Sequence, residues 1–141
     1  MAFEPNIPPI QVHLCVRGGA DAIAFNEKAF GATTTMSQLA DDKVRVMHAN
    51  LAMFGGEIML HDEFPEFGGD VMAPPTRGGA SLAININLKK ADDVDAAIKR
   101  AEAAGATVAM PAGDMFWGSR YGRIRDPFGH VWAFNAPSEK N

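Results

Sequence analysis

Hydrophobic residues recur at helical spacing in two segments of the chain and alternate with polar residues in much of the remainder. Helices are predicted for ADAIAFNEKAF, residues 20–30, and for DDVDAAIKRAEAA, residues 92–104. Each segment is followed by Gly-Ala-Thr. Gly31 and Gly105 can close the helices, because glycine adopts the left-handed conformation of a helix C-terminus without strain. We therefore expect two helices with equivalent ends.

The two helices belong to an internal repeat. Gly105 follows Gly31 by 105 − 31 = 74 residues, and the same shift places Phe54-Gly55 on Phe128-Gly129. Short alanine-rich helices align easily by chance, but a Phe-Gly match some two dozen residues beyond the helix makes chance a poor explanation. The sequence therefore predicts two copies of one module.

Alternating segments predict one strand before each helix and three strands after it. The expected strands are residues 9–17, 33–39, 43–53 and 57–62 in the first module, and 81–88, 107–110, 121–125 and 130–135 in the second. Segment 63–80 is rich in Pro and Gly, which indicates a linker over the surface. We expect an α+β fold in one domain, residues 1–141, with βαβββ modules at about 9–62 and 81–135.

Composition narrows the possible partners and compartment. A chain of 141 residues suits a single domain. The lone Cys15 cannot form an internal disulfide, and the N-terminal segment lacks the features of a secretory signal, so a cytoplasmic location is expected. A net charge of −4 without a basic cluster argues against nucleic acid. No apolar run is long enough to cross a membrane. The expected partner is a small molecule or a second copy of the chain.

The segment FWGSRYGRIRDPFGHVWAFN, residues 116–135, resembles the PhnB-like branch of the vicinal oxygen chelate superfamily, also called the glyoxalase, bleomycin-resistance and dioxygenase superfamily. HLCVRGGADAIAFNEKAFGA and GGEIMLHDEFP support the resemblance, which covers nearly the whole chain. It implies two βαβββ modules whose curled mixed sheets surround a cavity. It implies the fold more strongly than the function, because one fold hosts many functions.

The resemblance also implies where a metal ion would bind. Metal-using members take one ligand from the first and one from the last strand of each module, and the last-strand ligand is a glutamate. The offset of the repeat places these glutamate positions at Met59 and Ala133. A thioether is a soft, weak donor and a methyl group is none. The first strands offer Gln11 or His13 and Ser81 or Asn85. We therefore expect no divalent metal at the inherited site, and no cofactor.

Strand alternation sorts side chains between the cavity and the helices. The cavity side of the first module receives Gln11, His13, Cys15, Glu57 and His61. In the second module, Asn85 falls on the cavity side, and Trp132 and Phe134 fall on the helix side. The offset of 74 residues matches Gln11 with Asn85.

The loop FWGSR and the strand after it carry groups suited to a ligand. A guanidinium group of Arg123 or Arg125 matches a carboxylate or phosphate, and Trp117 and Tyr121 can stack on a ring. The alternative for the two arginines is a salt bridge with Asp126 or Glu57. The expected ligand is anionic or aromatic, and the expected ligand-binding residues are His13, His61, Asn85, Trp117, Tyr121, Arg123 and Arg125.

Four further residues are assigned structural roles. His48, on an interior strand, is expected to be a packing residue, and His130 is expected at the surface in the turn before the last strand. Cys15 has no clearly activating neighbour and is expected to be an inert thiol. Asp126, which precedes Pro-Phe-Gly, is expected to bind backbone N–H groups of its own turn.

Two functions are weighed, and a metal-free catalyst remains open as a third. The first is a metal-independent small-molecule binder, in the manner of antibiotic-sequestering members. It would act as a homodimer that completes the pockets and covers open sheet edges. Phe64 and Phe67 of the EFPEFGG linker are candidates for the contact between copies. The second is a metal-dependent enzyme of the lyase, isomerase or dioxygenase type, using His13, His61 and Glu57 as an improvised metal site.

Overall fold

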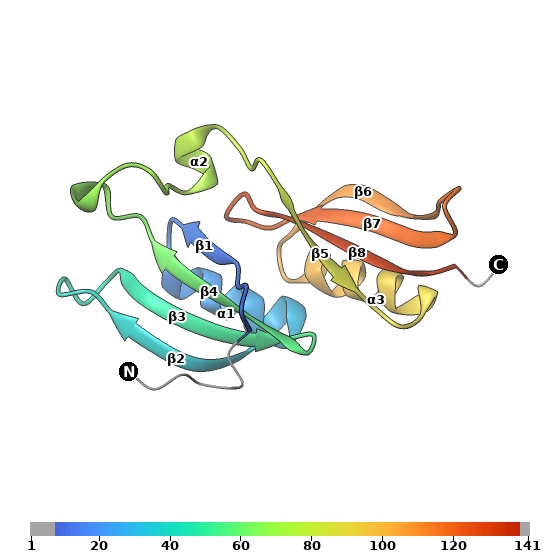
Figure 1. Cartoon of the computed structure of the whole chain (residues 1–141), viewed down its shortest axis with the longest axis horizontal. Coiled ribbons are helices and arrows are strands. Elements are labelled where there is room, and N and C mark those ends of the chain that lie inside the picture. The colour runs from blue at the N-terminus through green and yellow to red at the C-terminus, as the bar shows by residue number, and fades with distance from the viewer. Residues whose placement is uncertain (1–7, 139–141) are drawn as a thin grey trace.

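The repeated sequence pattern folds as two modules, each with a four-stranded sheet and one long helix (Figure 1). The computed structural model describes residues 8–138. The first module comprises β1 (His13–Val16), α1 (Gly19–Phe30), β2 (Thr33–Leu39), β3 (Val46–Met53) and β4 (Gly56–Asp62). The second comprises β5 (Ala83–Asn87), α3 (Ala91–Ala103), β6 (Thr107–Asp114), β7 (Ser119–Arg125) and β8 (Val131–Pro137). The predicted α+β class and the twofold βαβββ order are confirmed.

Both sheets have the same topology, in the orders β1-β4-β3-β2 and β5-β8-β7-β6. The first and last strands of each module pair in parallel, with His13 opposite Met59 and Asn85 opposite Ala133. Since Met59 and Ala133 are related by the repeat, His13 corresponds to Asn85. The expected match of Gln11 with Asn85 is therefore wrong by two residues. A shift of two preserves the face of a strand, so the assignment of side chains to faces is unaffected.

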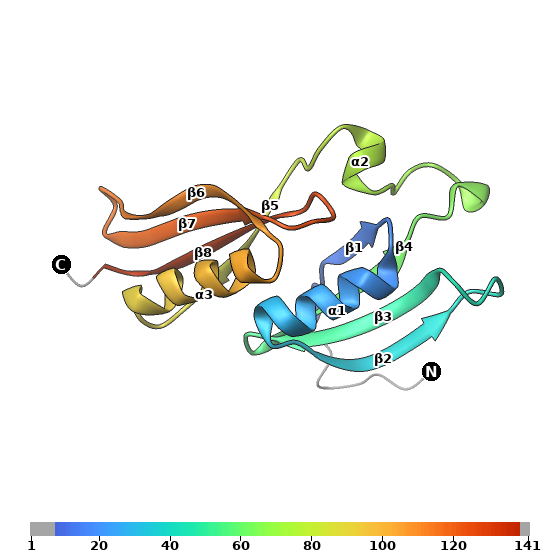
Figure 2. The ribbon, with the colours of Figure 1, turned by 180° about the vertical axis from the view of Figure 1, so that it is seen from behind.

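The helices α1 and α3 lie on the same side of the two sheets and share one core (Figure 2). The ring of Phe30 in α1 packs 4.6 Å, between centroids, from the ring of Trp132 in β8. Trp132 and Phe134 are fully buried, which confirms their expected place on the helix side. The Arg100 side chain of α3 adds a hydrogen bond from Nε to the carbonyl oxygen of Lys28 in α1, at 2.9 Å. Aromatic packing across the repeat thus joins the modules.

Glycines and buried carboxylates shape the turns. Gly31 and Gly105 have φ angles of 66° and 119°, as expected for residues that end helices. The carboxylate of Asp126 accepts hydrogen bonds from the backbone N–H groups of Phe128 and His130, both at 2.9 Å, which confirms its expected role. Its other oxygen accepts a hydrogen bond from Nε1 of Trp132 at 2.9 Å. The turn before β8 is therefore fixed to the core.

The linker between the modules is ordered by short helical turns. It contains a 3-10 turn, η1 (Pro65–Phe67), and a single-turn helix, α2 (Pro74–Arg77), which the sequence pattern did not reveal. The Glu63 carboxylate accepts hydrogen bonds from the Ala73 amide at 2.8 Å and from the Thr76 hydroxyl. Arg17, directly after β1, pairs with the same carboxylate at 3.3 Å. The linker is thus tied to the first module. Within the described residues, no helix combines the length and apolar character needed to span a membrane.

Candidate functional site

Three histidines from three strands meet on the face of the first sheet that α1 does not cover. The ring centroid of His13 in β1 lies 4.5 Å from that of His61 in β4 and 5.4 Å from that of His48 in β3. His48 lies on β3, an interior strand of the sheet, and its ring packs against that of His13, in agreement with the packing role expected for it. The β2–β3 pairing is irregular here, because Gln38 pairs with His48 but Leu39 pairs with Val46. The irregularity leaves Met47 out of that ladder, whereas the β3–β4 ladder is regular from Met53 to Ala49, and its continuation places His48 opposite His61.

His61 and His48 each use one ring nitrogen in a hydrogen bond to a nearby group of the first module. Nδ1 of His61 donates to the carbonyl oxygen of Asp62 at 2.7 Å, so Nε2 remains for another group. Nε2 of His48 lies 2.7 Å from Oδ1 of Asn50. Burial lowers the pKa of His13, and the nearby imidazoles of His61 and His48 lower it further because their positive forms would repel its own. The cluster therefore favours a neutral His13.

Glu57 does not join the histidines. Its carboxylate accepts hydrogen bonds from the Gln11 side chain at 3.0 Å and from the Thr35 hydroxyl at 3.5 Å. Glu57 lies four positions before His61 along β4, a span of about 13 Å in a strand. Across residues 8–138, no group of three His, Cys, Asp or Glu side chains is arranged to hold a metal ion. The geometry gives no support to the improvised metal site.

The inherited metal positions are also unsuited to a hard divalent ion. They are the two pairs that face each other in the parallel ladders, His13 with Met59 and Asn85 with Ala133. Ala133 is buried and offers only a methyl group. The Asn85 amide donates to Oδ1 of Asn87 at 2.9 Å. One imidazole, one thioether and one amide do not provide the carboxylate ligands that such an ion prefers.

The second module brings together three of the residues predicted for ligand binding. Gly118, with a φ angle of 90°, allows the tight turn between β6 and β7 that carries Trp117. The Trp117 and Tyr121 ring centroids are 5.9 Å apart. Nε of Arg123 donates to the Tyr121 hydroxyl at 2.8 Å, and its guanidinium group lies 5.5 Å from the centre of the Tyr121 ring. The carboxylates considered as salt-bridge partners have other contacts, since Asp126 holds its turn and Glu57 binds Gln11.

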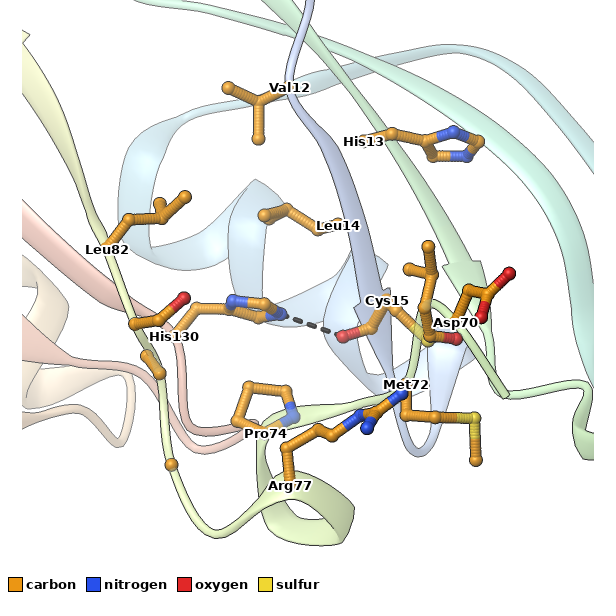
Figure 3. Close-up of a pocket in the computed structure, with 14 residues that line it drawn as sticks. Val12, His13, Leu14, Cys15, Asp70, Met72, Pro74, Arg77, Leu82 and His130 are labelled. Atoms are coloured by element: carbon orange, nitrogen blue, oxygen red, sulfur yellow. Dashed lines mark hydrogen bonds between the residues drawn. The ribbon is translucent and has the colours of Figure 1, made fainter. Parts of the chain in front are cut away.

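The seven predicted site residues do not line one cavity in the described chain. His13 lines a cavity of about 500 Å³ between β1 and the linker, shown in Figure 3, and His61 lies beside His13. Arg125 lines a cavity of about 520 Å³ near Gly129, and Asn85 lines one of about 320 Å³ that also contacts Glu57. Trp117, Tyr121 and Arg123 form a separate group on the second module. The sequence identified chemically suitable residues but could not place them relative to one another.

His130 is a site residue that the sequence interpretation missed. It was expected at the surface, but it is half-buried and lines the same cavity as His13. Its Nε2 lies 2.8 Å from the carbonyl oxygen of Cys15, a group that can only accept, so Nε2 carries the proton. The contact joins residues from different modules. Only the packing of the modules creates it, and no local sequence signal predicts it.

Cys15 lies next to this contact and is an unreactive thiol. The side chain is buried, and Sγ lies 3.8 Å from the carbonyl oxygen of Val71 in the linker. Burial raises the pKa of the thiol to about 11, and the negative charges of Glu63 and Asp62 act in the same direction. The nucleophilic thiolate is therefore scarce at neutral pH, in agreement with the expectation from sequence.

The model of the Glyoxalase/Bleomycin resistance protein/Dioxygenase superfamily matches residues 9–134. The chain belongs to this superfamily. A protein of Mycobacterium bovis described as uncharacterized, Mb0911c, is 39% identical over 131 residues, which span 92% of this chain and 84% of that protein. The resemblance inferred from residues 116–135 is thus confirmed. At Met59 and Ala133, where the resemblance predicts the glutamates of metal-using members, this chain has a thioether and a methyl group.

Solved structures show the same fold. TioX from Micromonospora sp. ML1 is 26% identical, with a TM-score of 0.66 over 91% of this chain and 97% of its own. The PhnB protein from Bacillus cereus is 18% identical, with a TM-score of 0.68 over 92% of this chain and 99% of its own. At that identity the likeness to PhnB shows the fold alone. The glyoxalase-superfamily architecture is therefore common to proteins of quite different sequence.

Proposed function

We propose that this superfamily member is a PhnB-like small-molecule-binding protein that does not use the divalent metal of its metal-dependent relatives. The observation that carries the proposal is the pairing of Ala133 with Asn85 and of Met59 with His13 in the two parallel ladders. The Ala133 side chain is a methyl group with no donor atom, so this position supplies no ligand atom to a metal ion. Binding then depends on polar and aromatic side chains.

The proposed ligand is anionic or aromatic. Trp117 is 53% exposed, an unusual state for so large a ring, and it lies against Tyr121. Arg123 is held by the Tyr121 hydroxyl, and an oriented guanidinium group is suited to a carboxylate or phosphate. The proposed binding residues are His13, His61, Asn85, Trp117, Tyr121, Arg123 and Arg125.

We propose further that two copies pair and complete the binding surfaces. Large apolar side chains are exposed in the single chain, among them Met36 and Leu39 of β2, which are 42% and 47% exposed. β2 is also one of the two edge strands of its sheet, and an exposed edge favours pairing with another chain. A homodimer would cover such surfaces and bring groups from two chains to one ligand. The unpaired Cys15 fits a reducing cytoplasm as the compartment.

The proposal is tested by comparing metals with organic ligands on one preparation. Protein purified without chelators or added metal is analysed for bound elements, and its melting temperature is followed with Ni²⁺, Zn²⁺, Mn²⁺ and Fe²⁺. A panel of small anions and aromatic compounds is assayed alongside. A ligand that binds the native state raises the melting temperature in a concentration-dependent way. We expect shifts from members of the organic panel and none from the metals. A stoichiometric ion would instead favour the metal-dependent alternative with His13, His61 and Glu57.

A further inference from the structure

A cavity of about 500 Å³ lies where the two modules and the linker meet (Figure 3). Its walls come from β1 of the first module, from Leu82 just before β5, from His130 in the turn before β8, and from linker residues. This volume is within the range of small-molecule sites, about 300 to 1,000 Å³. The cavity exists in the single chain, so it does not require a second copy.

Apolar side chains dominate opposite walls of the cavity. Val12 and Leu14 contribute from β1, and Leu82 faces the cavity from the second module (Figure 3). Val12 is 37% exposed and Leu82 is 62% exposed, so both present apolar surface that an occupant would remove from water. The imidazole of His130 is held between these walls by its hydrogen bond to the Cys15 carbonyl. A flat apolar ring fits such surroundings.

Two charged residues, Asp70 and Arg77, line the rim of the cavity. In Figure 3, Asp70 lies on the side of His13, whereas Arg77 lies on the side of Pro74. The Arg77 guanidinium group donates from Nη2 to the carbonyl oxygen of Gly69, the residue before Asp70. A guanidinium group has five N–H donors, so this bond leaves donors for an anion. The Arg77 end of the cavity is therefore suited to a carboxylate.

The linker that covers the cavity is held in place before any ligand arrives. Glu63 accepts hydrogen bonds from the Ala73 amide and the Thr76 hydroxyl, and Arg17 bonds to both the Glu63 carboxylate and the Thr76 hydroxyl. Burial opposes ionisation of Glu63, but these hydrogen bonds outweigh it and lower the pKa of the carboxyl group. Because α2 is anchored, little ordering entropy is lost when a ligand binds beneath it.

We propose that this inter-module cavity is a second binding site, which takes an apolar ring-bearing carboxylic acid. Its carboxylate pairs with Arg77, and its ring lies among Leu14, Leu82 and His130. The cavity shares His13 with the binding residues proposed above, but it is distinct from the group formed by Trp117, Tyr121 and Arg123 on the second module, and the inference does not depend on that group.

The experiment measures binding of naphthalene carboxylate to the full chain by isothermal titration calorimetry, with the neutral naphthalene carboxamide as the matched ligand. We expect saturable binding of the acid and weaker binding of the amide. Arg77→Gln is expected to weaken binding of the acid about tenfold, the effect of losing one charge-assisted hydrogen bond at a solvated rim. Lys89→Gln removes a cation that lines none of the three cavities and is expected to leave binding unchanged.

Two further variants separate the possible outcomes. Ala80→Trp places an indole in the exposed linker wall of the cavity and is expected to block the acid while the fold, checked by thermal unfolding, is retained. Equal affinity of wild type and Arg77→Gln, or of acid and amide, would overturn the inference, as would no binding at all. If Arg123→Gln abolishes binding and Arg77→Gln does not, the acid binds at the second-module group. The inference then fails while the proposed small-molecule function stands.

Discussion

The imidazole of His130 donates a hydrogen bond from Nε2 to the carbonyl oxygen of Cys15, over 2.8 Å and across 115 positions of the sequence. Cys15 lies in β1, which is an edge strand of its sheet. The outer side of an edge strand has backbone groups without ladder partners, and a buried carbonyl without a partner costs free energy. His130 supplies that partner from the second module. The hydrogen bond therefore helps to hold the two modules in their relative position.

His130→Ala is expected to lower the free energy of unfolding by about 1 to 2 kcal/mol, because the Cys15 carbonyl is left without its partner. Urea unfolding measures the loss. His48→Ala is the matched control, since it removes a half-buried imidazole whose contact with Asn50 lies within one strand. An equal loss of unfolding free energy in the two variants would show that the hydrogen bond between the modules adds no stability beyond that of an ordinary half-buried histidine.

His13 is expected to titrate below the ordinary histidine pKa of about 6.5, because burial and the imidazoles of His61 and His48 disfavour its charged form. The unfolded state then binds more protons than the folded state between the two pKa values. The contribution of His13 to stability is therefore present above about pH 6.5 and is lost as pH falls through the folded pKa. NMR titration of the ring proton measures the midpoint. His61→Gln should raise it, and an unchanged midpoint would exclude coupling between the two rings.

Arg123→Gln is expected to weaken binding of an anionic ligand at the second-module group by about 2 kcal/mol, the scale of a charge-assisted hydrogen bond. The melting temperature should hardly change, because Arg123 is exposed and its recorded contacts are with Tyr121. Calorimetry with an anion from the screen and a thermal melt of the same variant give both quantities. Severe destabilisation with unaltered affinity would identify Arg123 as part of a structural network.

The linker surface is expected to contribute to pairing of two copies through Phe67. This ring is 76% exposed, whereas Phe64 is covered by the guanidinium group of Arg45, 4.4 Å from its centre. Phe67→Ser is therefore expected to shift the sedimentation profile toward monomer at tens of micromolar. Val44→Ser, which removes another exposed apolar side chain, is the control. A monomeric wild type at that concentration would refute the dimer itself.

Local rules were sufficient for the elements of the fold. The ends of α1 and α3 follow from Gly31 and Gly105, whose positive φ angles only glycine adopts at little cost. The Asp126 turn follows from a side chain that binds its own backbone. Strand alternation placed Trp132 and Phe134 on the helix side, where both are fully buried. These features depend on neighbours a few residues away, so the sequence contains the information that determines them.

The arrangement of the candidate site depended on tertiary structure. The pairing of β4 with both β1 and β3 brought His48 beside His13, and register rather than the repeat offset paired Asn85 with Ala133. His130 reached Cys15, and the linker enclosed a cavity, only because the two modules share a core. The chemistry of each side chain and the missing glutamates were determined by the sequence alone. The distances between side chains from different modules were decided by packing. Local sequence patterns specify the strands and helix of each module but not how the two modules pack against each other.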